Sequence, residues 1–272
     1  MKDFINLLNP KLPEDFKPKI ALVLGSGLNA IVDDMEVLST VPYKDIPILP
    51  TTNVKGHVGN LLFGYLHGVP IVCMQGRFHF YEGISRAVIM DAIGMLHDLG
   101  CKTLLLTNAS GSLKKAITAG SLFLVKDHIN LQLDNPLIGA DQDKAVEFID
   151  LHNAYDANLR SILKRHADKL QIPLQEGVYF AVTGPNYETF AEASAFSKLG
   201  GDVIGMSTVP EVLVAKKYSM QVAVLTVVTN YSIEVDDSVA SHDEVLKNAS
   251  LASGDLSRLL INAIQDINNC VA

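Results

Sequence analysis

Val222-Ala223-Val224-Leu225-Thr226-Val227-Val228 is an apolar run of strand length, and Thr229-Asn230 follows it directly. An amide side chain at a strand end can offer both a donor and an acceptor to a ligand above it. Other predicted strands also end in small, amide or basic residues, at Gly25-Ser26-Gly27, Gly76-Arg77, Thr107-Asn108 and Met206-Ser207. Because parallel strands gather their ligand-binding loops at one edge, the pattern predicts one site built from distant pieces of chain.

Apolar runs of strand length alternate with helical patterns along the chain, which is typical of a parallel or mixed sheet covered by helices. The first strand is predicted at Ile20–Leu24. Two further strands, at 61–66 and 69–74, flank His67-Gly68, which predicts a tight hairpin turn because glycine tolerates a positive φ. We therefore expect an α/β fold with a mixed central sheet flanked by helices.

The spacing of apolar residues over 85–99 predicts a helix that covers the sheet and stops at Gly100. No repeat, low-complexity tract or linker rich in proline, glycine and serine divides the chain, so residues 1–272 are expected to form a single domain. Residues 132–150, which contain Pro136 and Gly139, look like an excursion from that domain.

Composition excludes several classes of protein. A chain of 272 residues that is 48% hydrophobic and 19% charged can bury one large core. Its net charge of −8 argues against non-specific binding of nucleic acid. An anionic small molecule would therefore have to be bound by a local pocket. Cys73, Cys101 and Cys270 are widely spaced, which favours buried thiols in a reducing compartment over a disulfide or zinc framework. The chain has no run of about 18 apolar residues, so we expect a cytoplasmic protein without a membrane partner.

Two predicted helix starts bear on chemistry. Thr189 with Glu192, and Thr208 with Glu211, both fit the capping box, in which a hydroxyl and a carboxylate satisfy amides of the first turn. Ser207 then lies at a helix N-terminus directly after a strand, where unpaired amides and the positive end of the dipole suit an anion. Ser207 is therefore a candidate phosphate ligand.

The glycine loop after the first strand is ambiguous by itself. Gly25-Ser26-Gly27-Leu28-Asn29-Ala30 matches the permissive dinucleotide-binding fingerprint, which needs an acidic residue at the end of a second strand about 20 positions later. Asp45 lies near that distance, but its segment, Val41 to Pro47, is poor for a buried strand because it contains two prolines. A simple turn, a phosphate loop and a dinucleotide site all remain open on this segment alone.

Gly76-Arg77-Phe78-His79 supplies basic groups at another strand end. Because Arg77 and His79 are two positions apart, both side chains can point to one side and offer a guanidinium and an imidazole to the same anion. His57 lies between Gly56 and Gly59 in a loop that could close over a bound anion. Taken alone, Arg77 is more often a solvated charge and His79 more often a structural histidine, and His57 could equally be an exposed turn histidine.

Taken together, these segments resemble the purine nucleoside phosphorylases of the trimeric type. The resemblance is ordered along residues 20 to 250. Asn108-Ala109-Ser110-Gly111-Ser112-Leu113 is similar to the xanthosine phosphorylase branch of that family. The motifs that carry the wider resemblance are Gly25-Ser26-Gly27-Leu28, Gly56-His57-Val58-Gly59, Gln75 to Gly83, Thr107-Asn108-Ala109-Ser110-Gly111, Gly184-Pro185-Asn186-Tyr187-Glu188-Thr189, Gly205-Met206-Ser207-Thr208-Val209-Pro210-Glu211, Thr229-Asn230 and Ser241-His242-Asp243-Glu244.

The resemblance implies a nucleoside phosphorylase fold and the conversion of a purine nucleoside and phosphate to the free base and ribose 1-phosphate. It implies phosphate as a co-substrate and a homotrimer whose further pairing stays open. No metal or cofactor is expected, because the acidic residues show no ligand spacing and Arg77 and amide donors can neutralise phosphate. Phe148 would reach a neighbouring subunit's site. The implied phosphate ligands are Ser26, His57, Arg77, His79, the amide of Ala109 and Ser207. The implied ribose ligands are Tyr81, Met206 and His242. The implied base ligands are Tyr187, Glu188 and Asn230, with Asn230, Glu188 and His242 as the catalytic residues.

The chemistry explains why such groups are needed. Breaking the glycosidic bond leaves negative charge on the departing purine, so donors placed beforehand at the base favour the reaction. Asn230 can donate to N7 or O6, and Glu188 can accept from the N1 hydrogen of a 6-oxopurine. Asparagine at position 230 therefore favours inosine, guanosine or xanthosine over adenosine.

The sequence departs from the family pattern beside the base. Tyr231 stands where other members have lysine, and Tyr187 stands where phenylalanine is frequent. The Tyr187 hydroxyl could reach the 2-oxo group of xanthine or could simply meet water. The residues alone leave two other functions open: a dinucleotide-dependent oxidoreductase and a non-catalytic nucleoside-binding protein.

Overall fold

The computed structural model describes residues 12–51, 54, 56–140, 145–236 and 242–270, with the backbone alone for His242. The described strands form one sheet in the order β2-β3-β4-β1-β5-β8-β7-β6-β9. The strands are β1 (Ile20–Leu24), β2 (Met35–Pro42), β3 (Asn60–Leu66), β4 (Val69–Gln75), β5 (Thr103–Ser112), β6 (Leu122–Leu131), β7 (Leu174–Val182), β8 (Val203–Gly205) and β9 (Gln221–Tyr231). The α-helices are α2 (Arg86–Asp98), α3 (Ala157–Leu170), α4 (Phe190–Lys198), α5 (Val209–Lys217) and α6 (His242–Cys270).

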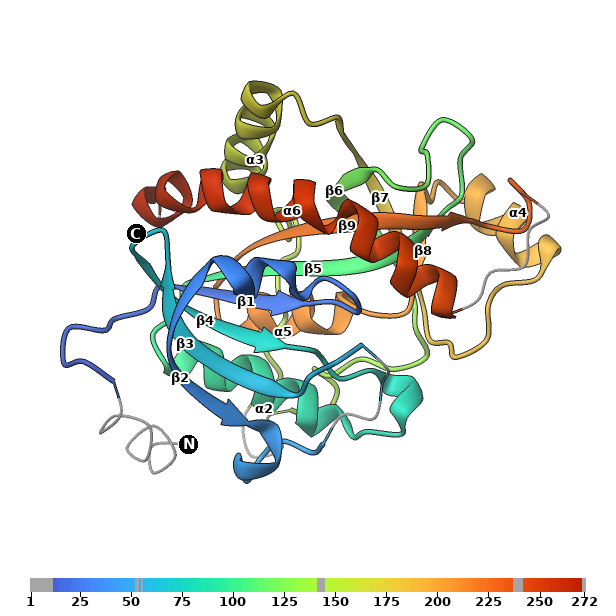
Figure 1. The fold of residues 1–272 in the computed structure, drawn as a ribbon. Helices are drawn as coiled ribbons and strands as arrows, with labels where there is room; N and C mark the ends of the chain where they lie inside the picture. The colour runs from blue at the N-terminus through green and yellow to red at the C-terminus, as the bar shows by residue number, and fades with distance from the viewer. Residues whose placement is uncertain (1–11, 52–53, 55, 141–144, 237–241, 271–272) are drawn as a thin grey trace.

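The sheet combines an open part with a closed ring. Strand β5 pairs in parallel with β1 and with β9, and its last residues pair antiparallel with β8. Because β9 also pairs with β6, and β6 with β7, the strands β5, β9, β6, β7 and β8 close on one another. Strands β1, β4, β3 and β2 extend from β5 as an open sheet (Figure 1). The predicted mixed α/β sheet is confirmed.

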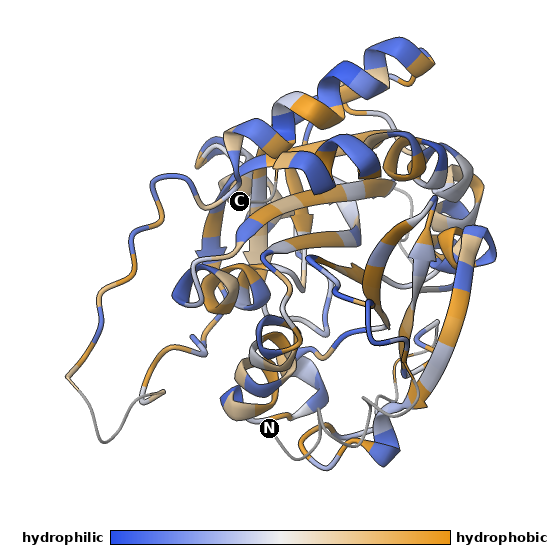
Figure 2. Cartoon of the chain, turned by 90° about the vertical axis from the view of Figure 1, so that its left-hand side faces the viewer, coloured by the Kyte–Doolittle hydropathy of each residue, from blue (hydrophilic) through white to orange (hydrophobic). Residues whose placement is uncertain are grey.

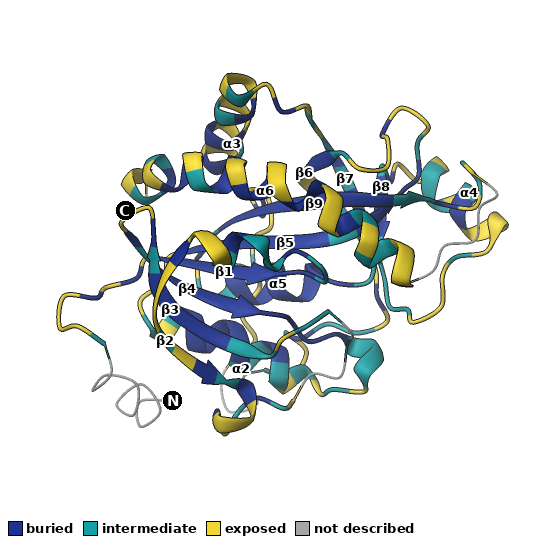
Figure 3. Cartoon of the chain, in the orientation of Figure 1, coloured by how far each residue is buried: buried dark blue, intermediate teal, exposed yellow. Residues whose placement is uncertain are grey.

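Helices cover both faces of the open sheet, as the alternation in β1 shows. Ala21 and Val23 pack in a cluster that contains the buried residues of α2 and α5. Leu22 and its neighbours two positions away pack in a second cluster with α3 and α6. Figure 1 shows these two pairs of helices on opposite sides of the strands. The strands between them are largely apolar (Figure 2) and buried (Figure 3), while the helices expose one face.

The short-range predictions at the hairpin and the first long helix are confirmed. Strands β3 and β4 pair antiparallel across His67 and Gly68, whose φ values of 48° and 77° are both positive. Such a pair of angles matches the right-handed twist of a two-residue hairpin. Helix α2 is followed by Gly100, whose φ of 103° ends the helical run.

Two predicted strand ends are wrong in detail. Strand β5 continues past Thr107-Asn108 to Ser112, and β9 continues past Asn230 to Tyr231. The two strands remain paired to these ends through an irregularity between Ser110 and Gly111. The polar residues therefore lie on paired strands, and this pairing holds them more rigidly than a loop would.

The segment after the glycine loop forms no dinucleotide-binding unit. Residues Asn29–Asp34 form a 3-10 helix (η2), and the following strand β2 pairs antiparallel with β3 at the edge of the sheet. Asp45 lies in a second 3-10 helix, Tyr43–Asp45 (η3). A dinucleotide site needs a parallel βαβ unit at this point, which the observed topology does not provide.

The predicted excursion contains no helix or strand among its described residues, 132–140 and 145–150. Asp134, near the start of the excursion, forms an ion pair with Arg86 on α2. Several apolar side chains of the excursion are exposed, with Leu133 at 94% and Phe148 at 93%, whereas Leu137 packs against the core. The prediction that all three cysteines are buried is wrong for Cys270, which is exposed, while Cys73 and Cys101 are buried. Within the described part of the chain, no helix combines the length and the apolar character needed to cross a membrane.

We predict that Leu259→Ala will lower the free energy of unfolding by about 2–5 kcal/mol, because Leu259 is fully buried between α6 and the sheet and its truncation leaves a cavity. Leu251 on the same helix is 76% exposed, so Leu251→Ala is the matched control and should change stability by less than about 0.5 kcal/mol. Urea unfolding followed by circular dichroism measures both. Equal effects would show that α6 is not packed as described.

Candidate active site

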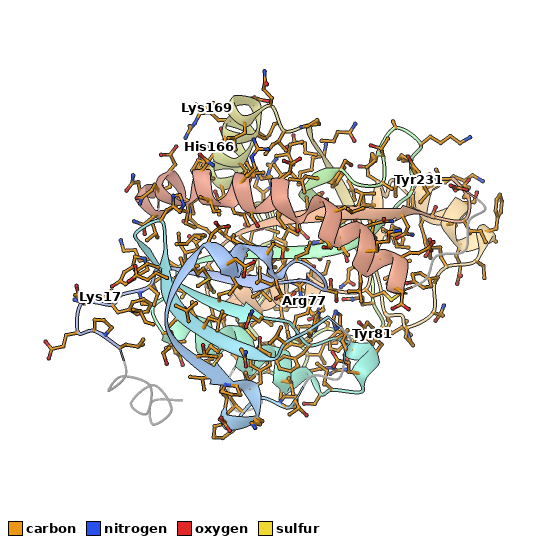
Figure 4. All side chains as sticks on the ribbon, viewed as in Figure 1. Lys17, Arg77, Tyr81, His166, Lys169 and Tyr231 are labelled. Atoms are coloured by element: carbon orange, nitrogen blue, oxygen red, sulfur yellow. The ribbon has the colours of Figure 1, made fainter. Side chains whose placement is uncertain are left out.

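A cavity of about 530 Å³ lies where the strand ends and loops predicted to bind a ligand come together. Residues from the glycine loop, β5, β9 and the segment before α5 line it. In Figure 4, Arg77 and Tyr81 lie near the carboxyl ends of β1 and β4, and Tyr231 lies at the end of β9. The predicted site residues that line the cavity are Ser26, Arg77, His79, Tyr81, Ala109, Tyr187, Glu188, Met206, Ser207 and Asn230.

Arg77 forms the centre of one end of the cavity. Its side chain is 1% exposed, and Nη1 donates to Ser207 Oγ at 3.2 Å and to Thr208 Oγ1 at 3.3 Å. Nε lies 3.3 Å from Glu211 Oε1. A buried guanidinium needs such a partner because an unpaired charge away from water is costly. Burial raises the pKa of Glu211 and the neighbouring Arg77 opposes that rise.

The predicted capping box at Thr208 is wrong in one half. Glu211 accepts a hydrogen bond from the Thr208 backbone, but the Thr208 side chain makes no capping bond. Its hydroxyl accepts instead from Asn108 Nδ2 at 2.6 Å and from Arg77 Nη1. The predicted box at Thr189 is confirmed in both halves, because Thr189 Oγ1 accepts from Glu192 N and Glu192 accepts from Thr189 N.

Three aromatic rings stack beside the Arg77 end. The ring centroids of His57 and His79 are 5.3 Å apart, and those of His79 and Tyr81 are 4.6 Å apart. His79 Nδ1 lies 3.0 Å from Glu82 Oε1. His57 does not line the cavity but contacts Ser26 Oγ through Nε2 at 3.0 Å. Burial, together with nearby His79 and Arg77, lowers the pKa of His57 to about 3, so this ring is neutral near pH 7.

The other end of the cavity carries a carboxylate and an amide. Glu188 lies just before α4, and burial raises its pKa, with a smaller contribution from Glu192. Asn230 is held at both ends of its amide, since Oδ1 accepts from Thr229 Oγ1 at 2.9 Å and Nδ2 donates to Tyr231 O at 3.0 Å. The second N–H of Asn230 remains for a ligand.

Asn230 packs closely against β5. A Cβ built on Gly111 would lie 3.2 Å from Asn230 Nδ2, so a larger residue at position 111 would displace the amide. Tyr231 contributes its backbone oxygen to Asn230 but does not line the cavity. Ile204 and Val245 are among the other residues that line the cavity.

Two less polar residues also line the cavity. Met206 and Tyr81 both lie close to Gly184, because a Cβ built there would be 2.3 Å from Met206 Sδ and 3.3 Å from a Tyr81 ring carbon. The lining therefore combines cationic and hydroxyl groups, an aromatic and a thioether side chain, and a carboxylate and an amide. This combination fits a ligand that has an anionic part and a flat polar ring.

Phe148 and His242, like His57, are predicted site residues that are not among the described residues lining the cavity. Phe148 is 93% exposed on the excursion and does not line the cavity. The side chain of His242 lies outside what the structure describes. Sequence reasoning gave no ligand-site role to Asn108, Thr208 or Glu211, which hold Arg77 and Ser207 in place. The strand-end pattern singled out Asn108, and the capping pattern singled out Thr208 and Glu211, but neither pattern predicted that they hold Arg77 and Ser207.

Comparisons with known proteins agree with this geometry. A family model described as the Phosphorylase superfamily matches residues 19–265. Purine nucleoside phosphorylase 1 of Bacillus subtilis is 43% identical over 252 residues, covering 91% of this chain and 92% of that protein. The Mus musculus purine nucleoside phosphorylase is 36% identical over 263 residues, covering 93% and 90%.

Solved structures give the same result for the whole fold. The Schistosoma mansoni purine nucleoside phosphorylase in complex with inosine matches with a TM-score of 0.88 at 35% identity, covering 97% of this chain and 95% of that one. The complex with adenosine matches with a TM-score of 0.89, covering 98% and 96%. The chain therefore belongs to the Phosphorylase superfamily, as one of its purine nucleoside phosphorylases.

Proposed function

We propose that this phosphorylase acts on 6-oxopurine nucleosides, namely inosine, guanosine and xanthosine. The observation that carries the proposal is one cavity whose lining combines Arg77, Ser26 and Ser207 with Glu188 and Asn230. Inorganic phosphate is the co-substrate, and the reaction needs neither metal nor organic cofactor. The C1′–N9 bond breaks, its electron pair stays on the purine, and a phosphate oxygen forms the new bond to C1′.

At the anion end, the guanidinium of Arg77, the hydroxyls of Ser26 and Ser207 and the amide of Ala109 bind phosphate. His79 stands beside them, and His57 supports Ser26 from outside the cavity through the 3.0 Å contact. Phosphate held in this way lies under C1′ as positive charge develops on the ribose. Placing an anion there beforehand lowers the barrier without reorganisation during the reaction.

At the base end, Glu188 accepts from the N1 hydrogen and Asn230 donates to N7 or O6 as charge builds on the leaving purine. Tyr81, Met206 and His242 surround the ribose. A 6-amino purine would present a donor where Asn230 also donates, so adenosine is the poorer substrate. The Schistosoma mansoni enzyme has been solved with adenosine as well as inosine, which makes a quantitative comparison of the two nucleosides informative here.

We predict that Asn230→Ala will lower kcat for inosine by on the order of 100 to 1000-fold, because it removes a donor that acts mainly in the transition state. Asn230→Asp is the matched control and should shift the ratio of kcat/KM towards adenosine. Release of free base is measured with and without phosphate over inosine, guanosine, xanthosine and adenosine. An unchanged rate for Asn230→Ala, or base release that ignores phosphate, would reject the assignment.

We further propose that Tyr187 gives the site its activity on xanthosine. Its side chain lines the cavity while the residue as a whole is 41% exposed, which leaves the hydroxyl able to meet either a ligand or water. Burial and the neighbouring Glu188 and Glu244 raise the pKa of Tyr187, so its hydroxyl keeps its proton at neutral pH and can donate to a 2-oxo group.

The expected outcome for Tyr187→Phe is a loss of kcat/KM for xanthosine of about 10-fold, the usual size for one hydrogen bond. The same change should leave kcat/KM for inosine within about twofold, since inosine has no 2-oxo group and the ring stays in place. Both values come from initial rates under saturating phosphate. A parallel loss for both nucleosides would instead assign Tyr187 to stacking.

We also propose a homotrimer in which Phe148 of one copy completes the site of the next. An apolar ring that is 93% exposed is costly in water, and the exposed Leu133 and Val146 on the same excursion add to the surface available to a second copy. The three cysteines are unpaired thiols, which suits a reducing compartment, and we propose the cytoplasm. Further pairing of trimers would need a surface beyond this excursion.

We predict that mixing Phe148→Ala with Arg77→Ala protomers will restore activity. In a mixed assembly, some sites combine the intact Arg77 of one copy with the intact Phe148 of another. Co-refolded mixtures are assayed against each variant refolded alone, and light scattering gives the assembly state. Activity of the mixture equal to the mean of the two variants would show that each site is built from one chain.

A further inference from the structure

The backbone at Thr208 adopts a conformation that a threonine rarely takes. Its φ is 73° and its ψ is −53°, and Val209 N donates to Ser207 O at 2.8 Å. These values describe a three-residue γ-turn with a positive central φ, the rarer and more strained of the two forms. A β-branched residue at such a φ is an outlier, and outliers of this kind cluster at ligand sites, where the surrounding structure maintains them.

The turn brings the Thr208 hydroxyl into a buried hydrogen-bond network. Thr208 Oγ1 receives a hydrogen bond from Asn108 Nδ2 at 2.6 Å and one from Arg77 Nη1 at 3.3 Å. It lies 3.1 Å from Ser207 Oγ. A hydroxyl has two acceptor positions and one proton. Because both acceptor positions of Thr208 are used, its own proton is left for Ser207 Oγ.

The same count of donors and acceptors determines whether the Ser207 hydroxyl donates or accepts. Ser207 Oγ accepts from Arg77 Nη1 at 3.2 Å and from Thr208, so Ser207 can act only as a donor to anything else. One competing acceptor is the Tyr179 hydroxyl, which already accepts from Ser207 N at 3.4 Å. The Ser207 proton can instead point into the cavity, which Ser207 lines. An anion bound there would be a stronger acceptor than the Tyr179 hydroxyl, because hydrogen bonds to ionised groups are shorter and stronger.

We propose that Thr208 and Asn108 are positioning residues that orient the Ser207 proton towards phosphate. The inference deepens the function proposed above and rests on it. Asn108 is 2% exposed and Thr208 1% exposed, so water does not compete for their contacts. Without the Thr208 hydroxyl, Ser207 is free to turn its proton away from the cavity, and the anion end loses a donor prepared in advance.

Three substitutions at position 208 separate the hydroxyl from the backbone. Thr208→Ser keeps the hydroxyl and should leave the KM for phosphate within about twofold. Thr208→Val keeps the shape and should raise that KM by about 10-fold, while the KM for inosine changes by less than about twofold. Thr208→Gly relieves the strained φ but removes the hydroxyl, and should match Thr208→Val. Thermal unfolding checks that each variant is folded.

A double-mutant cycle tests whether Thr208 acts through Ser207. If it does, Thr208→Val added to Ser207→Ala should raise the phosphate KM no further than Ser207→Ala alone, whereas independent effects would multiply. Calorimetric binding of inorganic phosphate gives the same comparison without turnover, so the inference is tested even if the wild type fails the nucleoside panel. A normal phosphate KM in Thr208→Val, wild-type behaviour of Thr208→Gly, or multiplied effects in the double variant would overturn the proposal.

Discussion

The pairing of β5 with β9 is the contact on which both the fold and the site depend. It joins the open sheet to the closed ring of strands, since β5 also pairs with β1 and β9 also pairs with β6. An irregularity lies within this pairing, because Ser110 pairs with Val228 and Gly111 pairs with Asn230, which leaves Thr229 as the extra residue. The amide of Ala109 and the side chain of Asn230, assigned to opposite ends of the ligand, are therefore held by one hydrogen-bonded pair of strands.

The anion end shows how a buried charge is accommodated. Arg77 has almost no contact with solvent, so its guanidinium must be satisfied by the protein and by the ligand. Glu211 balances the charge from α5, while Ser207 and Thr208 accept from Nη1. Because these partners are side chains on one rigid helix start, the orientation of the guanidinium does not depend on a mobile loop. His57 adds no charge near neutral pH.

The sequence allows much of this arrangement to be predicted, and the limits have a physical cause. Local patterns were sufficient for the hairpin at His67-Gly68, the Thr189 cap and the gathering of Ser26, Arg77 and Ser207 at one edge. The family resemblance adds Glu188 and Asn230, which also line the cavity. The role of Thr208 was mispredicted because a capping motif describes contacts within one helix turn, whereas its hydroxyl bonds to a residue 100 positions away. Such contacts follow from tertiary packing, which has no local signal.

The ring of strands leaves β2 as the one described strand with a single neighbour in the sheet. Unpaired strand edges are templates for pairing with other chains, and proteins protect them against aggregation. In β2 the register with β3 shifts between Val37 and Ser39, and the strand ends at Pro42, which has no N–H to donate. Glu36 adds an exposed charge. Among the described strands, the sheet thereby presents one edge, interrupted by a register shift and ended by a proline, to other unfolded or partly folded chains, which opposes edge-to-edge aggregation.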